Sequence, residues 1–160
     1  MTTDGVLSVQ ASTRLISLLS APEFVEMNMN DIVHTVLGWS RPYLSERKTA
    51  LTIEMNCELP RIRGNQERLT DVLSALLFRA ERSSAAGTTG MIRIRSWATD
   101  DEVGLSLWDN GFGASRDTVA PDPCLSLTEC AEIISDHGGW MYSWRPYSGG
   151  ASYTIILPVN

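Results

Sequence analysis

Asp109-Asn110-Gly111-Phe112-Gly113 is the stretch from which the fold of this chain can be argued. It follows Val103, Leu105 and Leu107, whose alternation with other residues predicts a strand. Glycines at a strand end have no Cβ, so the backbone there can come close to a bound molecule. A carboxylate beside them is able to accept a hydrogen bond from a ligand amine. The same letters also occur in plain turns, so the surrounding elements must decide between a site and a turn.

The chain ahead of this stretch alternates between helical and extended patterns. A short apolar stripe predicts a helix over 9–19, and Asn28 or Asn30 is expected to cap a second helix that Pro42 kinks or restarts. The clearest amphipathic pattern begins after the cap residue Asn65 and continues to Ala80. Residues 51–55 predict a strand, and 59–64 predict a turn with a short extended piece. Residues 91–97 predict a strand that forms a hairpin with the one leading to Asp109.

The chain beyond this stretch predicts one more helix and one more hairpin. Ser126 and Glu129 have the spacing of a capping box, and His137-Gly138-Gly139 is expected to end the helix that they begin. Two strands over 140–144 and 152–157 follow, with a turn at Ser148-Gly149-Gly150. Because the strands cluster without regular βαβ alternation, the predicted fold class is α+β. It is a two-layer α/β sandwich, with a mixed sheet covered on one face by about three helices.

Composition and charge argue against several classes of partner and site. The 160 residues carry a net charge of −6, and their arginines are scattered, which argues against a nucleic-acid partner. No apolar run has membrane-spanning length and no signal peptide is visible, so a cytoplasmic location without a membrane partner is expected. Cys57, Cys124 and Cys130 form an odd set without metal-ligand spacing, which predicts buried free thiols rather than disulfides or a zinc site.

Taken in order, these motifs resemble the GHKL, or Bergerat-fold, ATPases, and most closely the ATP-binding domain of bacterial sensor histidine kinases. The stretch 109–113 matches the first glycine box, and the helix after Asn65 matches the nucleotide-binding helix. Residues 29–33, 59–65, 137–139 and 150–158 match the first helix, the loop before the nucleotide helix, the last helix stop and the final hairpin. The resemblance implies an ATPase domain over 28–160. Residues 1–27 then form an N-terminal helical segment that resembles the tail of a dimerisation hairpin.

The resemblance also implies a ligand and the residues that hold it. Asp109 would accept the adenine amino group of ATP or ADP, while Gly111 and Gly113 would let the base lie against the backbone. A carboxylate at this point favours adenine over guanine, because guanine presents a carbonyl there and two acceptors would face each other.

The nucleotide helix departs from the family pattern. Arg79 stands where the family has the asparagine that coordinates magnesium, and Ala75 stands at its other common asparagine. A guanidinium has only donors and cannot ligate a cation, so the usual Mg²⁺ site is expected to be absent and no metal ligand is assigned. Arg79, assisted by Arg82 one turn on, would either replace the metal by pairing with phosphate oxygens or remain as a solvated arginine in a pocket without nucleotide.

The phosphate-binding motif and the phosphoacceptor depart as well. Cys124 and Ser126 occupy the glycine positions of the second glycine box, and Ser126 with Glu129 would consume helix-start amides that a phosphate needs. No histidine precedes Asn28, and His34 lies in the first domain helix, where a structural role is expected. Autophosphorylation within the chain is therefore not expected, and no catalytic residue is assigned.

Two functions follow from these observations. The first is a two-component-type signalling protein with a degenerate kinase-like domain. It would act mainly by binding a sensor kinase, a response regulator or a sigma-factor regulator, with a homodimer through the N-terminal helix as a further contact. The alternative is an active histidine kinase, or an anti-sigma-type serine kinase, that phosphorylates a residue on a partner chain. Some of the five tryptophans would serve as exposed contact anchors, with burial expected for most.

Overall fold

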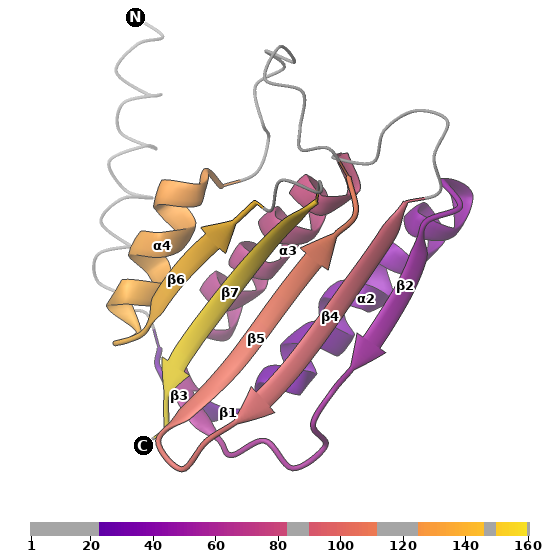
Figure 1. Cartoon of the computed structure of the whole chain (residues 1–160). Coiled ribbons are helices and arrows are strands. Elements are labelled where there is room, and N and C mark those ends of the chain that lie inside the picture. The colour runs from indigo at the N-terminus through magenta and orange to yellow at the C-terminus, as the bar shows by residue number, and fades with distance from the viewer. Residues whose placement is uncertain (1–22, 83–89, 112–124, 146–149, 160) are drawn as a thin grey trace, which may run out of the picture.

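The fold is a mixed five-stranded sheet with helices on one face, as predicted (Figure 1). The computed structural model describes residues 23–82, 90–111, 125–145 and 150–159. The predicted helix at 9–19 lies outside these ranges. In the sheet order β2-β4-β5-β7-β6, β2 and β4 are parallel and the other neighbours are antiparallel. Its strands are β2 (Ala50–Glu54), β4 (Met91–Ala98), β5 (Glu102–Asp109), β6 (Trp140–Trp144) and β7 (Ala151–Pro158).

Three helices are found among the described residues, and they cover one face of the sheet: α2 (Met29–Glu46), α3 (Gln66–Arg82) and α4 (Leu127–Asp136). Asn28 caps α2 as expected, since its side chain accepts from the Asn30 N–H at 2.8 Å. The expected restart at Pro42 is wrong, because α2 continues to Glu46. Pro42 and Gly38 are both exposed, so water can solvate the Gly38 carbonyl that Pro42, lacking an N–H, leaves unbonded.

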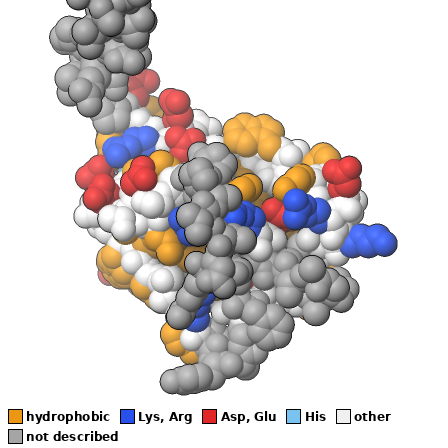
Figure 2. Space-filling view, turned by 90° about the horizontal axis from the view of Figure 1, so that it is seen from above, with side chains coloured by type: hydrophobic (Ala, Val, Ile, Leu, Met, Phe, Trp, Pro, Cys, Tyr) orange, Lys and Arg blue, Asp and Glu red, His pale blue; other side chains and the backbone are white. Residues whose placement is uncertain are grey.

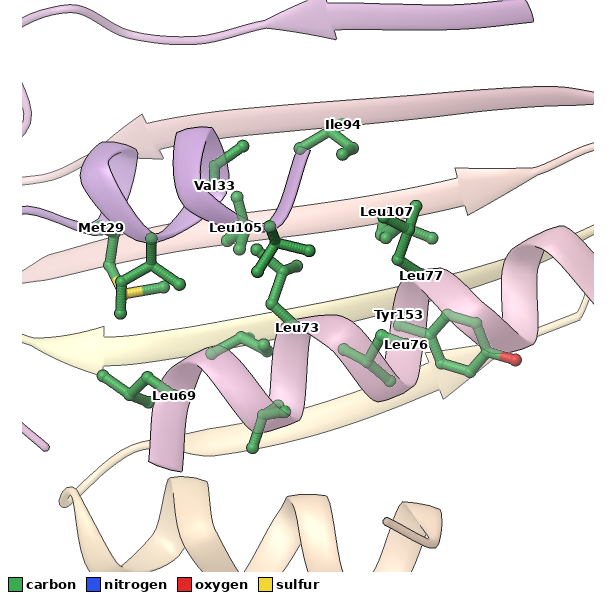
Figure 3. Close-up of a cluster of buried hydrophobic side chains, with 14 of the residues drawn as sticks. Met29, Val33, Leu69, Leu73, Leu76, Leu77, Ile94, Leu105, Leu107 and Tyr153 are labelled. Carbon is green, nitrogen blue, oxygen red and sulfur yellow. The ribbon is translucent and has the colours of Figure 1, made fainter. Parts of the chain in front are cut away.

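The core lies between α3 and the sheet (Figure 3). Asn65 begins α3 by accepting from the Arg68 N–H at 3.0 Å, which confirms the predicted cap. The helix then turns one apolar face toward α2 and the strands, where each buried aliphatic side chain contributes about 1.5–3 kcal/mol. The α3 side chains of this face are Leu69, Val72, Leu73, Ala75, Leu76, Leu77 and Ala80.

A short ribbon lies outside the main sheet, and only its second strand, the extended piece within 59–64, was predicted. It consists of β1 (Val25–Met27) and β3 (Ile62–Gly64), which pair antiparallel. Only one of the three β1 side chains, that of Met27, is buried, so the strand has no periodicity that could reveal it.

His137 ties the beginning of α3 to the end of α4. Its Nε2 accepts the Asn65 backbone N–H at 3.0 Å, so Nε2 carries no proton in this arrangement. The other ring nitrogen, Nδ1, lies 2.7 Å from the carbonyl oxygen of Ile133 and therefore donates to it. The chain then leaves α4 through Gly138, whose φ of +77° favours glycine. The predicted helix stop is confirmed, and His137 adds a long-range contact to it.

Two predictions about burial are wrong. Trp39, Trp140 and Trp144 are 66%, 50% and 64% exposed, so most of the five tryptophans are not buried. The reason for the latter two is that β6 is an edge strand whose even-numbered side chains face away from the helices. Cys57 is exposed in a loop, whereas Cys130 is buried in α4 as expected. No helix in the described parts of the chain is long and apolar enough to cross a membrane.

Candidate functional site

Five segments end or begin at one edge of the sandwich, the upper edge in Figure 1. They are the carboxyl ends of α3, β5 and β6, the start of α4 and the start of β7. Figure 2 views the molecule from this edge and shows Lys and Arg side chains next to hydrophobic ones on it. The motifs that the sequence singled out, residues 109–111, Arg79 and Ser126, therefore lie at the same edge of the fold.

Asp109 is the buried anion of this edge. It ends β5 and is only 1% exposed. Its Oδ1 accepts the backbone N–H of Gly111 at 2.9 Å, and the Gly111 carbonyl in turn accepts from the Gly150 N–H. Gly150 has a φ of +89°, and a Cβ there would lie 2.5 Å from the Asp109 carbonyl oxygen, so only glycine fits beside this turn. Gly113, predicted to face the base, lies outside the described residues.

Tyr153 brings the charged groups of this edge together. The pairing of Leu107 with Tyr153 places the tyrosine on the helix-covered face of β7, which Asp109 shares on β5. Burial raises the pKa of the Tyr153 hydroxyl, and the Asp109 carboxylate raises this pKa further. Arg145, which also hydrogen-bonds the hydroxyl, and Arg79 act in the opposite direction on the same pKa. One carboxylate and two guanidinium groups thus act electrostatically on the phenol of Tyr153.

Sequence reasoning singled out Asp109 and Arg79 for this candidate site but not Tyr153 and Arg145. Tyr153 looks like an ordinary inward-facing strand residue, and Arg145 like a solvated residue after an edge strand. Only the strand order, which inserts β7 between β5 and β6, brings both to the site. No local pattern in the sequence carries that information.

Arg82 is placed differently from Arg79. Its guanidinium lies over the ring of Phe78, 5.5 Å from the centroid, on the side of α3 that faces α2. Arg79 is half-buried and acts electrostatically on Tyr153. Of the two arginines predicted to pair with phosphate, Arg79 is the one that affects the pKa of Tyr153.

The start of α4 carries a complete capping box. Ser126 Oγ accepts the Glu129 N–H at 3.1 Å, and Glu129 Oε1 accepts the Ser126 N–H at 3.3 Å. These bonds use helix-start amides, and Glu129 places a negative charge in the first turn of the helix. The predicted capping box is confirmed. A phosphate approaching this helix start would have to compete with Ser126 and would be repelled by Glu129.

Magnesium does not fit the residues at the family's metal-binding positions. Arg79 offers only donors and a positive charge. Ala75 is 1% exposed and packs in the core cluster, so its position has no access to a ligand. Within the described ranges, no group of three His, Cys, Asp or Glu side chains could hold a metal ion. The charges at this edge suit an anion held by arginines better than a bound divalent cation.

Comparison with curated proteins gives relatives of one kind. The chain is 30% identical over 143 residues to the sensor histidine kinase ZraS of Escherichia coli O157:H7, an alignment that covers 80% of this chain and 31% of that protein. It is 27% identical over 150 residues to the signal transduction histidine-protein kinase AtoS of Escherichia coli K12, covering 86% and 24%. The chain thus spans less than a third of the length of these relatives. No family model matches it.

Solved structures agree on the fold. The catalytic domain of the histidine kinase ThkA superposes with a TM-score of 0.72 at 25% identity, covering 85% of this chain and 95% of that domain. The Acinetobacter baumannii histidine kinase AdeS gives a TM-score of 0.70 at 20% identity, covering 97% and 77%. The α+β sandwich is therefore the fold of solved histidine kinase catalytic domains.

Proposed function

Because the chain is a homologue of the catalytic, GHKL-type ATPase domain of sensor histidine kinases, we propose that it binds an adenine nucleotide at the edge around Asp109. In this proposal it serves two-component signalling mainly through protein contacts, as a pseudokinase domain. Asp109 accepts the adenine amino group, with Gly111 and Gly113 beside the base. Arg79 and Arg145 pair with phosphate oxygens in place of a metal, and Arg82 assists if its side chain leaves Phe78.

The observation that carries this proposal is the buried carboxylate of Asp109 at the end of β5, fixed beside Gly111. Arg79 and Arg145 support it, because both lower the pKa of the Tyr153 hydroxyl that Asp109 raises. Burying a carboxylate costs free energy unless a positive charge compensates it. Arg79 and Arg145 supply positive charge close enough to act on Tyr153, the same residue on which Asp109 acts. Guanidinium forms paired, charge-assisted hydrogen bonds with phosphate. ATP or ADP supplies the anionic partner for these donors and the amine for Asp109.

Weak or absent phosphoryl transfer follows from the same residues. This reaction depends almost entirely on positioning and on neutralising phosphate charge. Arg79 replaces the metal ligand, and the capping box of Ser126 and Glu129 uses the amides that would otherwise meet phosphate. The nucleotide would then stabilise the domain without being turned over at a kinase's usual rate.

A response regulator is the partner class that we favour, ahead of a sensor kinase or a sigma-factor regulator. The histidine kinase ThkA has been solved in complex with the response regulator protein TrrA, and that chain shares this fold at a TM-score of 0.71. The runner-up function is an active kinase domain that phosphorylates a histidine or serine on a partner chain. The retention of Asp109 at the end of β5 favours it.

A phosphotransfer assay separates the two functions. The chain is incubated with ATP labelled on the γ-phosphate, with magnesium, and with the histidine-bearing hairpin of a relative such as ZraS as acceptor. The catalytic domain of that relative serves as the positive control. We expect labelled acceptor only in the control. Labelling by this chain at a rate comparable to the control would establish the active kinase and refute the pseudokinase.

A further inference from the structure

Strand β6 presents an aromatic stripe that the proposed nucleotide site does not use. Trp140, Tyr142 and Trp144 are 50%, 54% and 64% exposed, and they alternate along five residues. Their register partners on β7 are Ile156, Thr154 and Ser152, which lie on the sheet face away from the helices. The intervening Met141 packs against the core on the helix side. Three large aromatic side chains thus project from the uncovered face of one short strand.

The same strand is an edge of the sheet (Figure 1). Among the described residues β6 pairs with β7 alone, so its other side offers main-chain donors and acceptors. Soluble proteins usually protect such an edge with a charged side chain, a proline or a bulge. The sequence Trp-Met-Tyr-Ser-Trp contains none of these devices. An unprotected aromatic edge is typical of a strand that pairs with another chain.

The order of the aromatic residues indicates that the strand pairing with β6 comes from a second copy of this chain. They are arranged symmetrically about Tyr142, with a tryptophan two residues to either side. In an antiparallel pair of identical strands centred on Tyr142, that tyrosine lies opposite the partner subunit's Tyr142. Trp140 lies opposite the partner subunit's Trp144, and the second tryptophan pair follows by symmetry. Directly opposed aromatic side chains are among the favourable cross-strand pairs.

Charge is compatible with this arrangement. The chain carries a net charge of −6, so most contacts between two copies would bring acidic groups together. β6 itself has no charged residue, and neither do its register partners 152–156 on β7. Arg145, which follows β6, acts on the hydroxyl of Tyr153, a residue of the helix-covered face. The edge is therefore a neutral path across which two copies can meet.

We propose that β6 pairs with β6 of a second copy of this chain, antiparallel and centred on Tyr142. The five-stranded sheet then continues across a twofold axis into the second copy. The two aromatic stripes join into one surface of six aromatic side chains. The contact uses the face of β6 away from the helices, whereas Asp109 and Tyr153 of the proposed nucleotide site lie on the helix-covered face. It also does not use residues 1–27, so it is separate from both the proposed function and the expected N-terminal dimer contact.

Charge swaps on β6 test the contact and its register together. The 160-residue chain is examined by analytical ultracentrifugation over a concentration series. We expect a dimer with a dissociation constant on the order of 10–100 µM for so short a strand pair. The double variant Trp140→Lys, Trp144→Lys places like charges opposite one another and should weaken the dimer at least tenfold. The double variant Trp140→Glu, Trp144→Lys places opposite charges there and should recover most of that loss at low salt.

Control variants distinguish a specific loss of the β6 contact from unfolding or a general loss of surface tryptophan. Trp39→Lys removes an equally exposed tryptophan from α2 and should leave the dimer unchanged. Circular dichroism of every variant confirms folding. Tyr142→Cys should form a disulfide-linked dimer under mild oxidation, beyond the background that the exposed Cys57 gives in the parent chain. A parent chain that stays monomeric up to about 0.5 mM, or a Lys, Lys variant that dimerises as well as the parent, would overturn the proposal.

Discussion

The backbone N–H of Gly111 donates to Asp109 Oδ1 over 2.9 Å, so the acid at the end of β5 holds the first glycine of its own motif. The carboxylate is fixed by this bond and by burial to 1% exposure. A side chain held in one orientation can discriminate between bases, because little conformational freedom is lost when the ligand binds. Asp109 therefore holds the turn at Gly111 and, in our proposal, recognises adenine. A suitable substitution can remove the second role and keep the first.

Asp109→Asn should retain the turn and lose the nucleotide. The asparagine Oδ1 can still accept from Gly111, but its amide NH₂ can no longer accept from the adenine amino group. We expect ATP and ADP affinity to fall about ten- to hundredfold in isothermal titration, the effect of one charge-assisted hydrogen bond. Asp101→Asn, at an exposed turn, is the control. Unchanged affinity in a folded Asp109→Asn protein would show that the base binds elsewhere.

Arg79→Ala should weaken nucleotide binding when magnesium is absent. The guanidinium is proposed to pair with phosphate oxygens, and removing it takes away a charged donor pair. We expect at least a tenfold loss of ATP affinity in EDTA. Arg68→Ala is the matched control, because Arg68 lies on the same helix but pairs with Asp136 at 3.1 Å. Equal affinities for the two variants would leave Arg79 without a role at the phosphates.

His137→Ala should destabilise the fold without touching the nucleotide edge. The alanine leaves the Asn65 N–H and the Ile133 carbonyl without the imidazole that now bonds both. Unsatisfied polar groups of this kind cost about 1–3 kcal/mol each in unfolding free energy. Urea denaturation measures the loss, and His34→Ala, at an exposed position of α2, should change stability by less than about 0.5 kcal/mol. Similar values for the two variants would mean that the contact contributes little.

Glu81 creates a pH dependence opposite to that of an ordinary paired acid. Its side chain is 2% exposed between α2 and α3, with Oε1 3.0 Å from Arg47 Nε. Burial raises the pKa of this carboxyl from 4.5, and the smaller effects of Arg47 and Tyr43 lower it. Above the ordinary pKa, the folded state therefore holds a proton more readily than the unfolded state. Stability that depends on Glu81 must rise as the pH falls through the raised pKa.

Glu81→Gln should accordingly stabilise the protein most at alkaline pH. The neutral amide removes the cost of a buried charge, so the variant's melting temperature should exceed that of the parent at about pH 8. The difference should shrink as the pH falls through the raised pKa of the parent carboxyl, because that carboxyl then takes up its proton. Glu54→Gln changes a half-exposed carboxylate and should show no such trend. A Glu81→Gln variant that is less stable than the parent at pH 8 would show that the Arg47 ion pair outweighs burial.

Much of the fold could be predicted because local signals were strong. The cap at Asn65 and the apolar repeat after it gave α3, and the capping box at Ser126 gave α4. The alternation before Asp109 gave β5 and its hairpin with β4. Each of these depends on neighbours within one or two turns of chain, which sequence reasoning can see.

The misses depend on contacts between distant residues. Tyr153 and Arg145 join the site only through the position of β7 between β5 and β6. Trp140 and Trp144 are exposed because they lie on the edge strand β6 and face away from the helices. Pro42 is tolerated because the helix face around Gly38 is exposed. An aromatic residue in a strand is sure to be buried only if both faces of the sheet are covered. Which strands lie at an edge and which face is covered depend on distant parts of the chain, so a local pattern cannot reveal them.

Titration of ATP into the parent chain, once with magnesium and once with EDTA, tests the central claim most directly. Arginine replaces the metal in this account, so the account predicts measurable binding in EDTA, with an affinity that magnesium changes less than about threefold. Binding that appears only when magnesium is present would contradict it.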